Sequence, residues 1–260
     1  MVFRRLSRWA IALPVALALV GVSGCGASTA APSQAPSAKA RELTVFAAAS
    51  LTGTFTELGK SFEAAHPGTT VRFNFGSSAT LAQQIVQGAP ADVFAAASPA
   101  TMKTVTDASL AAAPARFVRN KLEIAVPPDN PAKVDELKDL ADAKVKVALC
   151  AEQVPCGAAA VKALGAAGLK VTPVTLEQDV KATLTKVELG EVDAALVYKT
   201  DVLAAKGKVT GIAFPEANQA INDYPIATLS KAGDLAKQFV DLVLSQQGKD
   251  VLTKAGFEAP

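Results

Sequence analysis

The sequence predicts an α/β fold made of two small sheets joined by a hinge. Short apolar runs alternate with helical patterns, which is typical of mainly parallel sheets covered by helices on both faces. The number of runs is high for one open sheet, so two smaller sheets fit better. The predicted strands are 43–47, 71–75, 92–95, 122–126, 145–149, 171–175, 193–197, 211–214 and 224–228.

Helical stripes lie between these strands. Phe55, Leu58 and Phe62 recur at the spacing of one helix face, and a His-Pro-Gly sequence at 66–68 ends that helix. Further stripes are Leu81, Ile85 and Val86, before Gly88 and Pro90, and Leu235, Phe239, Leu242 and Val243, after Gly233. The segments 119–121 and 214–223 are the expected crossings between the two sheets.

The first 25 residues have the pattern of an export signal. Arginines at positions 4, 5 and 8 precede an apolar run over 9–22, which is shorter than the roughly 20 residues of a membrane-spanning helix. The run ends at Val22-Ser23-Gly24-Cys25, which resembles a bacterial lipobox and implies cleavage before Cys25 and acylation of its thiol. The alternative is an ordinary signal followed by a chance cysteine.

The domain boundaries follow from composition. Residues 26–40 are mostly Ala, Ser, Pro, Thr, Gly and Gln, which favours a flexible tether over a packed segment. We therefore expect a signal peptide at 1–24, a lipidated tether at 25–40, a first lobe from 41–120 plus 219–260, and a second lobe from 121–218.

The basic excess of the chain belongs to its signal. The whole sequence has 26 Lys and Arg against 24 Asp and Glu. Without residues 1–24, which hold three arginines and no acidic residue, 23 basic residues face 24 acidic ones, a net charge of −1. This balance gives no support for a nucleic-acid partner. Cys150 and Cys156 remain in the exported part, where a disulfide or two buried thiols are the alternatives.

Two serine-bearing turns are the most informative candidates for a site. Ser50 follows one apolar strand and precedes a helix, and Gly76-Ser77-Ser78 follows the next strand in the same way. A serine at this place caps the helix or, with the free N–H groups of the helix N-terminus, contacts an anion. Both turns lie at carboxyl ends of strands, where open α/β sheets bind ligands.

Three further junctions repeat the arrangement. Pro155-Cys156-Gly157 joins a strand to a helix, Asp179 is placed to cap the next helix, and Tyr198 follows an apolar strand. A phenol at a strand end is a hydrogen-bond donor toward a cleft, although a packing role in the core fits equally well.

These phrases together resemble a known family. The matching segments are TVFAAASLT at 44–52, SSATLAQQI at 77–85, GAPADVF at 88–94, VPCG at 154–157, EQDVK at 177–181, LVY at 196–198 and YPIA at 224–227. The chain resembles, over about 43–257, the molybdate-binding receptors of bacterial ABC importers, which have the two-lobed type II periplasmic-binding-protein fold.

The resemblance implies a ligand, its contacts and its partners. Ser50 and Ser78 would donate hydroxyl and N–H groups, Cys156 and Val180 would donate N–H groups, and Tyr198 would donate its phenol. Position 156 departs from the family, where alanine is common. The implied ligand is molybdate or tungstate, with no cofactor and no metal cation. The implied partner is a membrane permease, and the receptor would be a monomer held to the outer face of the membrane through Cys25.

Other functions have weaker support in the residues. Another oxyanion such as sulfate would suit the same donors. An exported enzyme is disfavoured because His66 is the only histidine and ends a helix, which leaves no Ser-His-Asp triad. The cysteines lack the Cys-x-x-Cys spacing of disulfide oxidoreductases, and we expect no enzyme activity.

Overall fold

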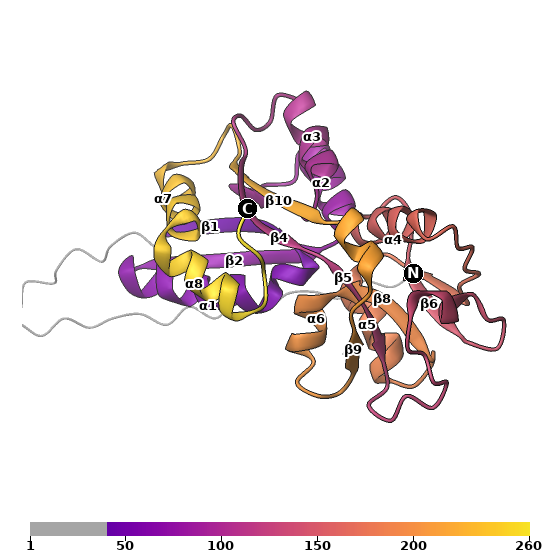
Figure 1. The fold of residues 1–260 in the computed structure, drawn as a ribbon. Coiled ribbons are helices and arrows are strands. Elements are labelled where there is room, and N and C mark those ends of the chain that lie inside the picture. The colour runs from indigo at the N-terminus through magenta and orange to yellow at the C-terminus, as the bar shows by residue number, and fades with distance from the viewer. Residues whose placement is uncertain (1–40) are drawn as a thin grey trace, which may run out of the picture. The chain divides into compact units, whose positions relative to one another are not determined.

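A computed structural model describes residues 41–260. The predicted signal peptide, the predicted acylation site Cys25 and the predicted tether up to residue 40 lie outside the described residues. Within the part of the chain that is described, ten strands form two separate five-stranded sheets, as the pattern of apolar runs predicted (Figure 1). None of the helices in 41–260 has the length and apolar character that a membrane crossing needs.

The first sheet has the strand order β2-β1-β3-β10-β4. Its strands are β1 (Arg41–Ala48), β2 (Thr69–Gly76), β3 (Val93–Ala95), β4 (Ala115–Asn120) and β10 (Asn222–Thr228). One face packs on α1 (Thr52–Ala65), α7 (Asp234–Leu244) and α8 (Gln246–Lys254). The other face packs on α2 (Ser78–Val86) and α3 (Pro99–Asp107).

The second sheet has the order β7-β6-β8-β5-β9. Its strands are β5 (Leu122–Val126), β6 (Val147–Cys150), β7 (Thr175–Glu177), β8 (Ala194–Tyr198) and β9 (Thr210–Ile212). The helices beside it are α4 (Pro155–Ala166), α5 (Val180–Glu188) and α6 (Lys199–Ala204), and short 3₁₀ turns lie at Ala49–Leu51, Leu137–Ala141 and Pro215–Gln219.

Each sheet is mixed rather than uniformly parallel. Strands β2, β1 and β3 are parallel, as are β7, β6 and β8. Strand β10 is antiparallel to β3 and β4, and β5 is antiparallel to β8 and β9. The parallel strands are those joined by helices, whereas the antiparallel ones carry the chain between the sheets without a helical crossover.

The chain passes between the sheets at the two predicted places. Only Lys121 separates β4 from β5, and residues 213–221 connect β9 to β10. Strand β4 itself was not predicted, because only three of its six positions are buried and it carries Arg116 and Arg119. Strand 171–175 was placed wrongly: β7 begins only at Thr175, after Pro173, which has no N–H for a sheet ladder.

The predicted helix stripes are largely buried. Phe55 and Phe62 contact Phe239 edge-on, with ring centroids 5.9 and 5.5 Å apart, so α1 and α7 share one aromatic core. Leu235 and Leu242 are only partly buried, and Val86, at the end of α2, is 42% exposed. His66 ends α1. Its ring stacks on Phe62, and its Nδ1 lies 2.8 Å from the carbonyl oxygen of Phe62, so the side chain has a structural role.

Candidate functional site

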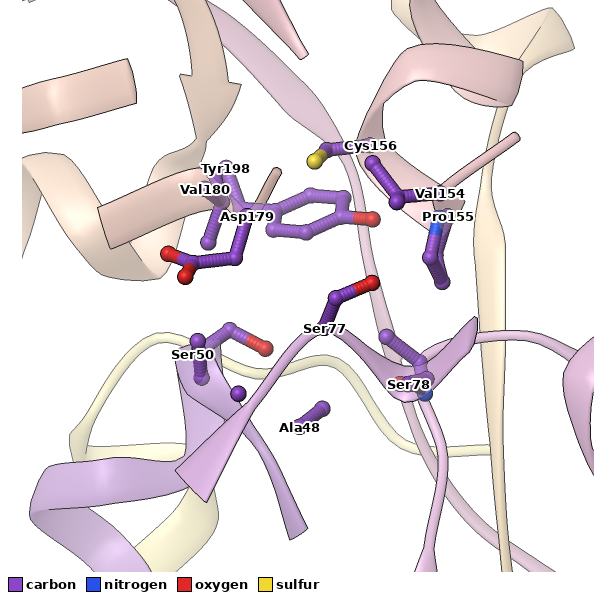
Figure 2. A pocket seen from close by; sticks show the side chains of 13 residues that line it. Ala48, Ser50, Ser77, Ser78, Val154, Pro155, Cys156, Asp179, Val180 and Tyr198 are labelled. Atoms are coloured by element: carbon purple, nitrogen blue, oxygen red, sulfur yellow. Dashed lines mark hydrogen bonds between the residues drawn. The ribbon is translucent and has the colours of Figure 1, made fainter. Parts of the chain in front are cut away.

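The serine turns, the Cys156 loop, the Asp179 turn and Tyr198 meet around one small cavity (Figure 2). All five predicted ligand positions line it. The lining residues are Ala48, Ala49, Ser50, Gly76, Ser77, Ser78, Ala97, Val154, Pro155, Cys156, Asp179, Val180 and Tyr198. The strands β1, β2, β3, β6, β7 and β8 all point their carboxyl ends at it, in keeping with the general rule for open α/β sheets.

The cavity has the size of a single small ion. Its volume is about 20 Å³. One water molecule needs roughly 10–15 Å³ on the same measure. This cavity has no room for a sugar or a peptide.

Ser50 does not cap the helix that follows it. It lies in the 3₁₀ turn Ala49–Leu51, and α1 begins at Thr52 with Leu51 as its N-cap. The Ser50 hydroxyl is instead 2.9 Å from the hydroxyl of Tyr224. The capping interpretation of Ser50 is therefore wrong, and its side chain stays at the cavity wall.

The Ser78 hydroxyl is held by a backbone N–H just beyond strand β3. Its Oγ accepts a hydrogen bond from the N–H of Ala97, just beyond β3, at 2.9 Å. Because a hydroxyl has one proton and that proton is not used here, Ser78 keeps its O–H available as a donor. The Ser78 N–H also stands in the first turn of α2, where no carbonyl of the same helix accepts it.

Ser77 is a site residue that the sequence prediction did not select. It is the N-cap of α2, yet its side chain makes no capping bond. Its buried Oγ has no hydrogen-bond partner among residues 41–260 and faces the cavity in Figure 2. The only available signal was its place beside Ser78.

The loop before α4 is closed by a disulfide. Cys150 at the end of β6 and Cys156 in the first turn of α4 are bonded, with 5.7 Å between their Cα atoms. Pro155, the first residue of α4, has no N–H, so Cys156 supplies the first N–H of that helix. That N–H donates to no group outside its helix within the described residues.

Gly157 lets this loop lie directly against the helix. A Cβ at this position would stand 1.9 Å from the carbonyl oxygen of Ala151 and 2.8 Å from that of Cys150. No side chain fits there. The disulfide and this close approach together define where the Cys156 N–H points.

The Asp179 turn leaves one N–H group free. As predicted, Asp179 caps α5: its Oδ1 accepts from the N–H groups of Lys181 at 2.8 Å and Ala182 at 3.0 Å. The N–H of Val180 does not donate to Asp179, and it has no acceptor outside α5 among the described residues. The cap thus satisfies the second and third N–H groups and leaves the first facing the cavity.

Tyr198 presents a buried phenol without a partner. Its ring is 1% exposed and packs edge-on against Tyr224, with centroids 6.1 Å apart. Its hydroxyl has no hydrogen-bond partner in residues 41–260 and points into the cavity in Figure 2. Burial raises the pKa of Tyr198 well above its usual value, so the phenol remains a donor. The ring therefore packs in the core while its hydroxyl serves the site.

An ion pair joins the Tyr198 and Val180 turns. Asp201 is fully buried, accepts from the Tyr198 N–H at 3.2 Å, and has its other oxygen 3.0 Å from Lys181 Nζ. Burial raises the pKa of Asp201 and the Lys181 ammonium opposes that effect. The pair ties the start of α6 to the start of α5.

The cavity is suited to an anion that brings no proton. Hydroxyl and N–H donors surround it, the long helices α2, α4 and α5 direct their N-termini at it, and their dipoles favour negative charge. No lysine or arginine is among its described lining residues, and its one carboxylate, Asp179, uses Oδ1 as the cap of α5. Within 41–260 no group of three or more His, Cys, Asp or Glu is placed to hold a metal ion.

Two sheets whose strand ends enclose one small donor-lined cavity define a solute-binding protein. Residues 43–258 match the family model of the bacterial extracellular solute-binding proteins, and the chain belongs to this family.

Relatives share nearly the full length of the chain. The molybdate-binding protein ModA of Mycobacterium tuberculosis is 41% identical over 249 residues, covering 94% of this chain and 95% of its own. The putative ABC transporter substrate-binding lipoprotein YvgL of Bacillus subtilis is 33% identical over 261 residues, covering 97% and 98%. The periplasmic molybdate-binding protein of Azotobacter vinelandii shares the fold, with a TM-score of 0.73 at 22% identity over 84% of this chain and 99% of its own.

Replacing Gly157 tests the loop geometry. We expect Gly157→Ala to lower the free energy of unfolding by about 1–3 kcal/mol, because the new methyl group overlaps the Ala151 carbonyl. Gly165→Ala is the matched control in the same helix: its Cβ meets nothing within 4 Å, and we expect a gain of roughly 0.5–1 kcal/mol. Urea denaturation measures both, and equal effects would contradict the assigned role of Gly157.

Proposed function

We propose that this protein is an extracytoplasmic receptor that captures molybdate, and tungstate, and delivers it to the permease of an ABC importer. The observation that carries the proposal is the one-ion cavity lined by donors without a cation. The names and high coverage of the molybdate-binding relatives support the choice of ligand.

The chemistry of the ligand suits this donor set. Molybdate and tungstate are tetrahedral dianions without protons at neutral pH, so their oxygens only accept hydrogen bonds. Hydrogen phosphate carries a proton and needs an acceptor, whereas most polar groups of the cavity are donors; the acceptors among its lining side chains are Asp179, whose Oδ1 is already used as a cap, and the hydroxyl of Ser77. Sulfate has the same charge and shape but is smaller, so its rejection rests on the size of the cavity.

Five residues hold the ion in this proposal. Ser50 and Ser78 donate hydroxyl and N–H groups, Cys156 and Val180 donate N–H groups, and Tyr198 donates its phenol. About seven bonds to a charged group contribute on the order of 10–20 kcal/mol. Association costs roughly 4–15 kcal/mol. Tight binding therefore needs no salt bridge.

The two sheets correspond to two lobes that close on the ion. We assign 41–120 plus 219–260 to the first lobe and 121–218 to the second, with the crossings at Lys121 and 213–221 as the hinge. The serines belong to the first lobe, and Cys156, Val180 and Tyr198 belong to the second. Because each lobe supplies part of the donor set, the bound ion favours the closed state.

Removing one donor tests the site. We expect Ser78→Ala to weaken molybdate binding by about 1.5–3 kcal/mol, roughly 10- to 150-fold, measured by titration calorimetry. Ser61→Ala, on the exposed face of α1, is the control and keeps wild-type affinity. An unchanged affinity in Ser78→Ala contradicts the site, and tight sulfate or phosphate binding without heat from molybdate contradicts the ligand.

The raised pKa of Tyr198 predicts how molybdate affinity depends on pH. A free phenol loses its proton near pH 10, whereas buried Tyr198 stays protonated to higher pH. We expect molybdate affinity to remain constant between about pH 7 and 10. A fall in affinity below pH 10 that disappears in Tyr198→Phe would show that the phenol ionises normally and would contradict this.

The membrane anchor is tested on the mature protein. Cleavage before Cys25 and acylation of its thiol place the receptor, as a monomer, on the outer face of the membrane. Mass spectrometry of protein recovered from the membrane fraction should show a mature N-terminus at Cys25 carrying acyl chains. A mature chain that starts elsewhere, or an unmodified Cys25, rules out the anchor.

A further inference from the structure

A chain of buried polar side chains runs behind the cavity, from one sheet to the other. Asn120 Nδ2, at the last residue of β4, lies 2.8 Å from Thr200 Oγ1 in α6 and 3.4 Å from Tyr224 Oη in β10. Tyr224 Oη lies 2.9 Å from Ser50 Oγ. All four residues are buried. Only Ser50 lines the cavity.

The hydrogen bonds in this chain have one direction. Asn120 Oδ1 accepts from the Lys121 N–H at 3.1 Å, which assigns the amide orientation and leaves Nδ2 as the donor toward Thr200 and Tyr224. Tyr224 Oη accepts from Asn120. Either hydroxyl can donate across the 2.9 Å contact between Tyr224 and Ser50, and we infer that Tyr224 is the donor because its oxygen already accepts from Asn120. Burial raises the pKa of Tyr224, so that proton stays in place.

The direction of these bonds determines what Ser50 can offer a ligand. We propose that Tyr224, oriented by Asn120, is a positioning residue that makes the Ser50 hydroxyl a donor and removes it as an acceptor for an oxyanion that carries a proton. The proposal rests on the proposed function and deepens it. Ser78 Oγ likewise accepts a hydrogen bond, from the Ala97 N–H, so Ser50 and Ser78 both keep their protons for a ligand, whereas Ser77 has no partner that orients its hydroxyl among the described residues.

The effect depends on the hydrogen bond that Ser50 Oγ accepts from Tyr224. A serine hydroxyl that is free to rotate both donates and accepts hydrogen bonds, so it can accept one from the P–OH group of hydrogen phosphate. With Tyr224 donating to it, Ser50 has its own proton directed at the cavity. The hydrogen-bonded side chains also include Thr200 in α6, two residues after Tyr198. They therefore link the two sheets across the crossing at Lys121.

The substitution Tyr224→Phe isolates the hydroxyl. The ring packs edge-on against Phe117, Tyr198 and Phe257, with centroid distances of 6.4, 6.1 and 5.5 Å, and phenylalanine keeps these contacts. Asn120 keeps its bond to Thr200. Thermal melting of the variant monitors the fold.

The experiment is a set of calorimetric titrations of the full-length protein with molybdate and with phosphate. We expect Tyr224→Phe to weaken molybdate binding about 3- to 10-fold and to narrow the preference for molybdate over phosphate by a similar factor. In a Ser50→Ala background, Tyr224→Phe should have no further effect.

Each outcome decides between the two proposals. If Ser50→Ala leaves molybdate affinity unchanged, the binding site itself is wrong. If Ser50→Ala weakens binding but Tyr224→Phe acts equally in both backgrounds, or leaves the preference over phosphate intact, the positioning role is overturned. If Tyr224→Phe does not fold, Asn120→Asp replaces it, because the new carboxylate accepts the Tyr224 proton and draws it away from Ser50. The preference for molybdate over phosphate should then fall as in Tyr224→Phe. An unchanged preference overturns the proposal.

Discussion

Holding a small dianion without a positive side chain is the constraint on which the rest of the structure depends. Only hydrogen-bond donors can serve such an ion, so N–H groups must reach the cavity unpaired. Proline at 155 makes Cys156 the first donor of α4, and Asp179 caps α5 while leaving the Val180 N–H free. The helices must therefore start at the strand ends that face the cavity.

Rigid surroundings keep these donors in place. The Cys150–Cys156 disulfide and the contact of Gly157 with the Ala151 carbonyl hold one turn. The buried Asp201 links two others through Lys181 and the Tyr198 N–H. Donors that are already ordered lose less conformational freedom on binding, which preserves more of the interaction free energy as affinity.

Much of the fold could be predicted from the sequence, and the misses have physical causes. Buried parallel strands read as apolar runs, so most strands were placed within a few residues. Strand β4 was missed because its arginines and half-exposed positions hide the pattern, and the run at 171–175 is interrupted by Pro173. Capping was the alternative to anion contact for Ser50, and it fails because the 3₁₀ turn before α1 moves Ser50 out of the capping position.

The sequence by itself determined which residues could face an anion, because strand ends, helix starts and the hydroxyl and phenol side chains are local features. It also pointed to the two cysteines, six residues apart. Only the tertiary structure decided the size of the cavity and the direction of each hydroxyl. Ser50 contacts Tyr224, 174 residues away, and Ser78 accepts from the N–H of Ala97, just beyond β3. A hydroxyl proton points where its distant partners leave room for it, and folding alone brings those partners together.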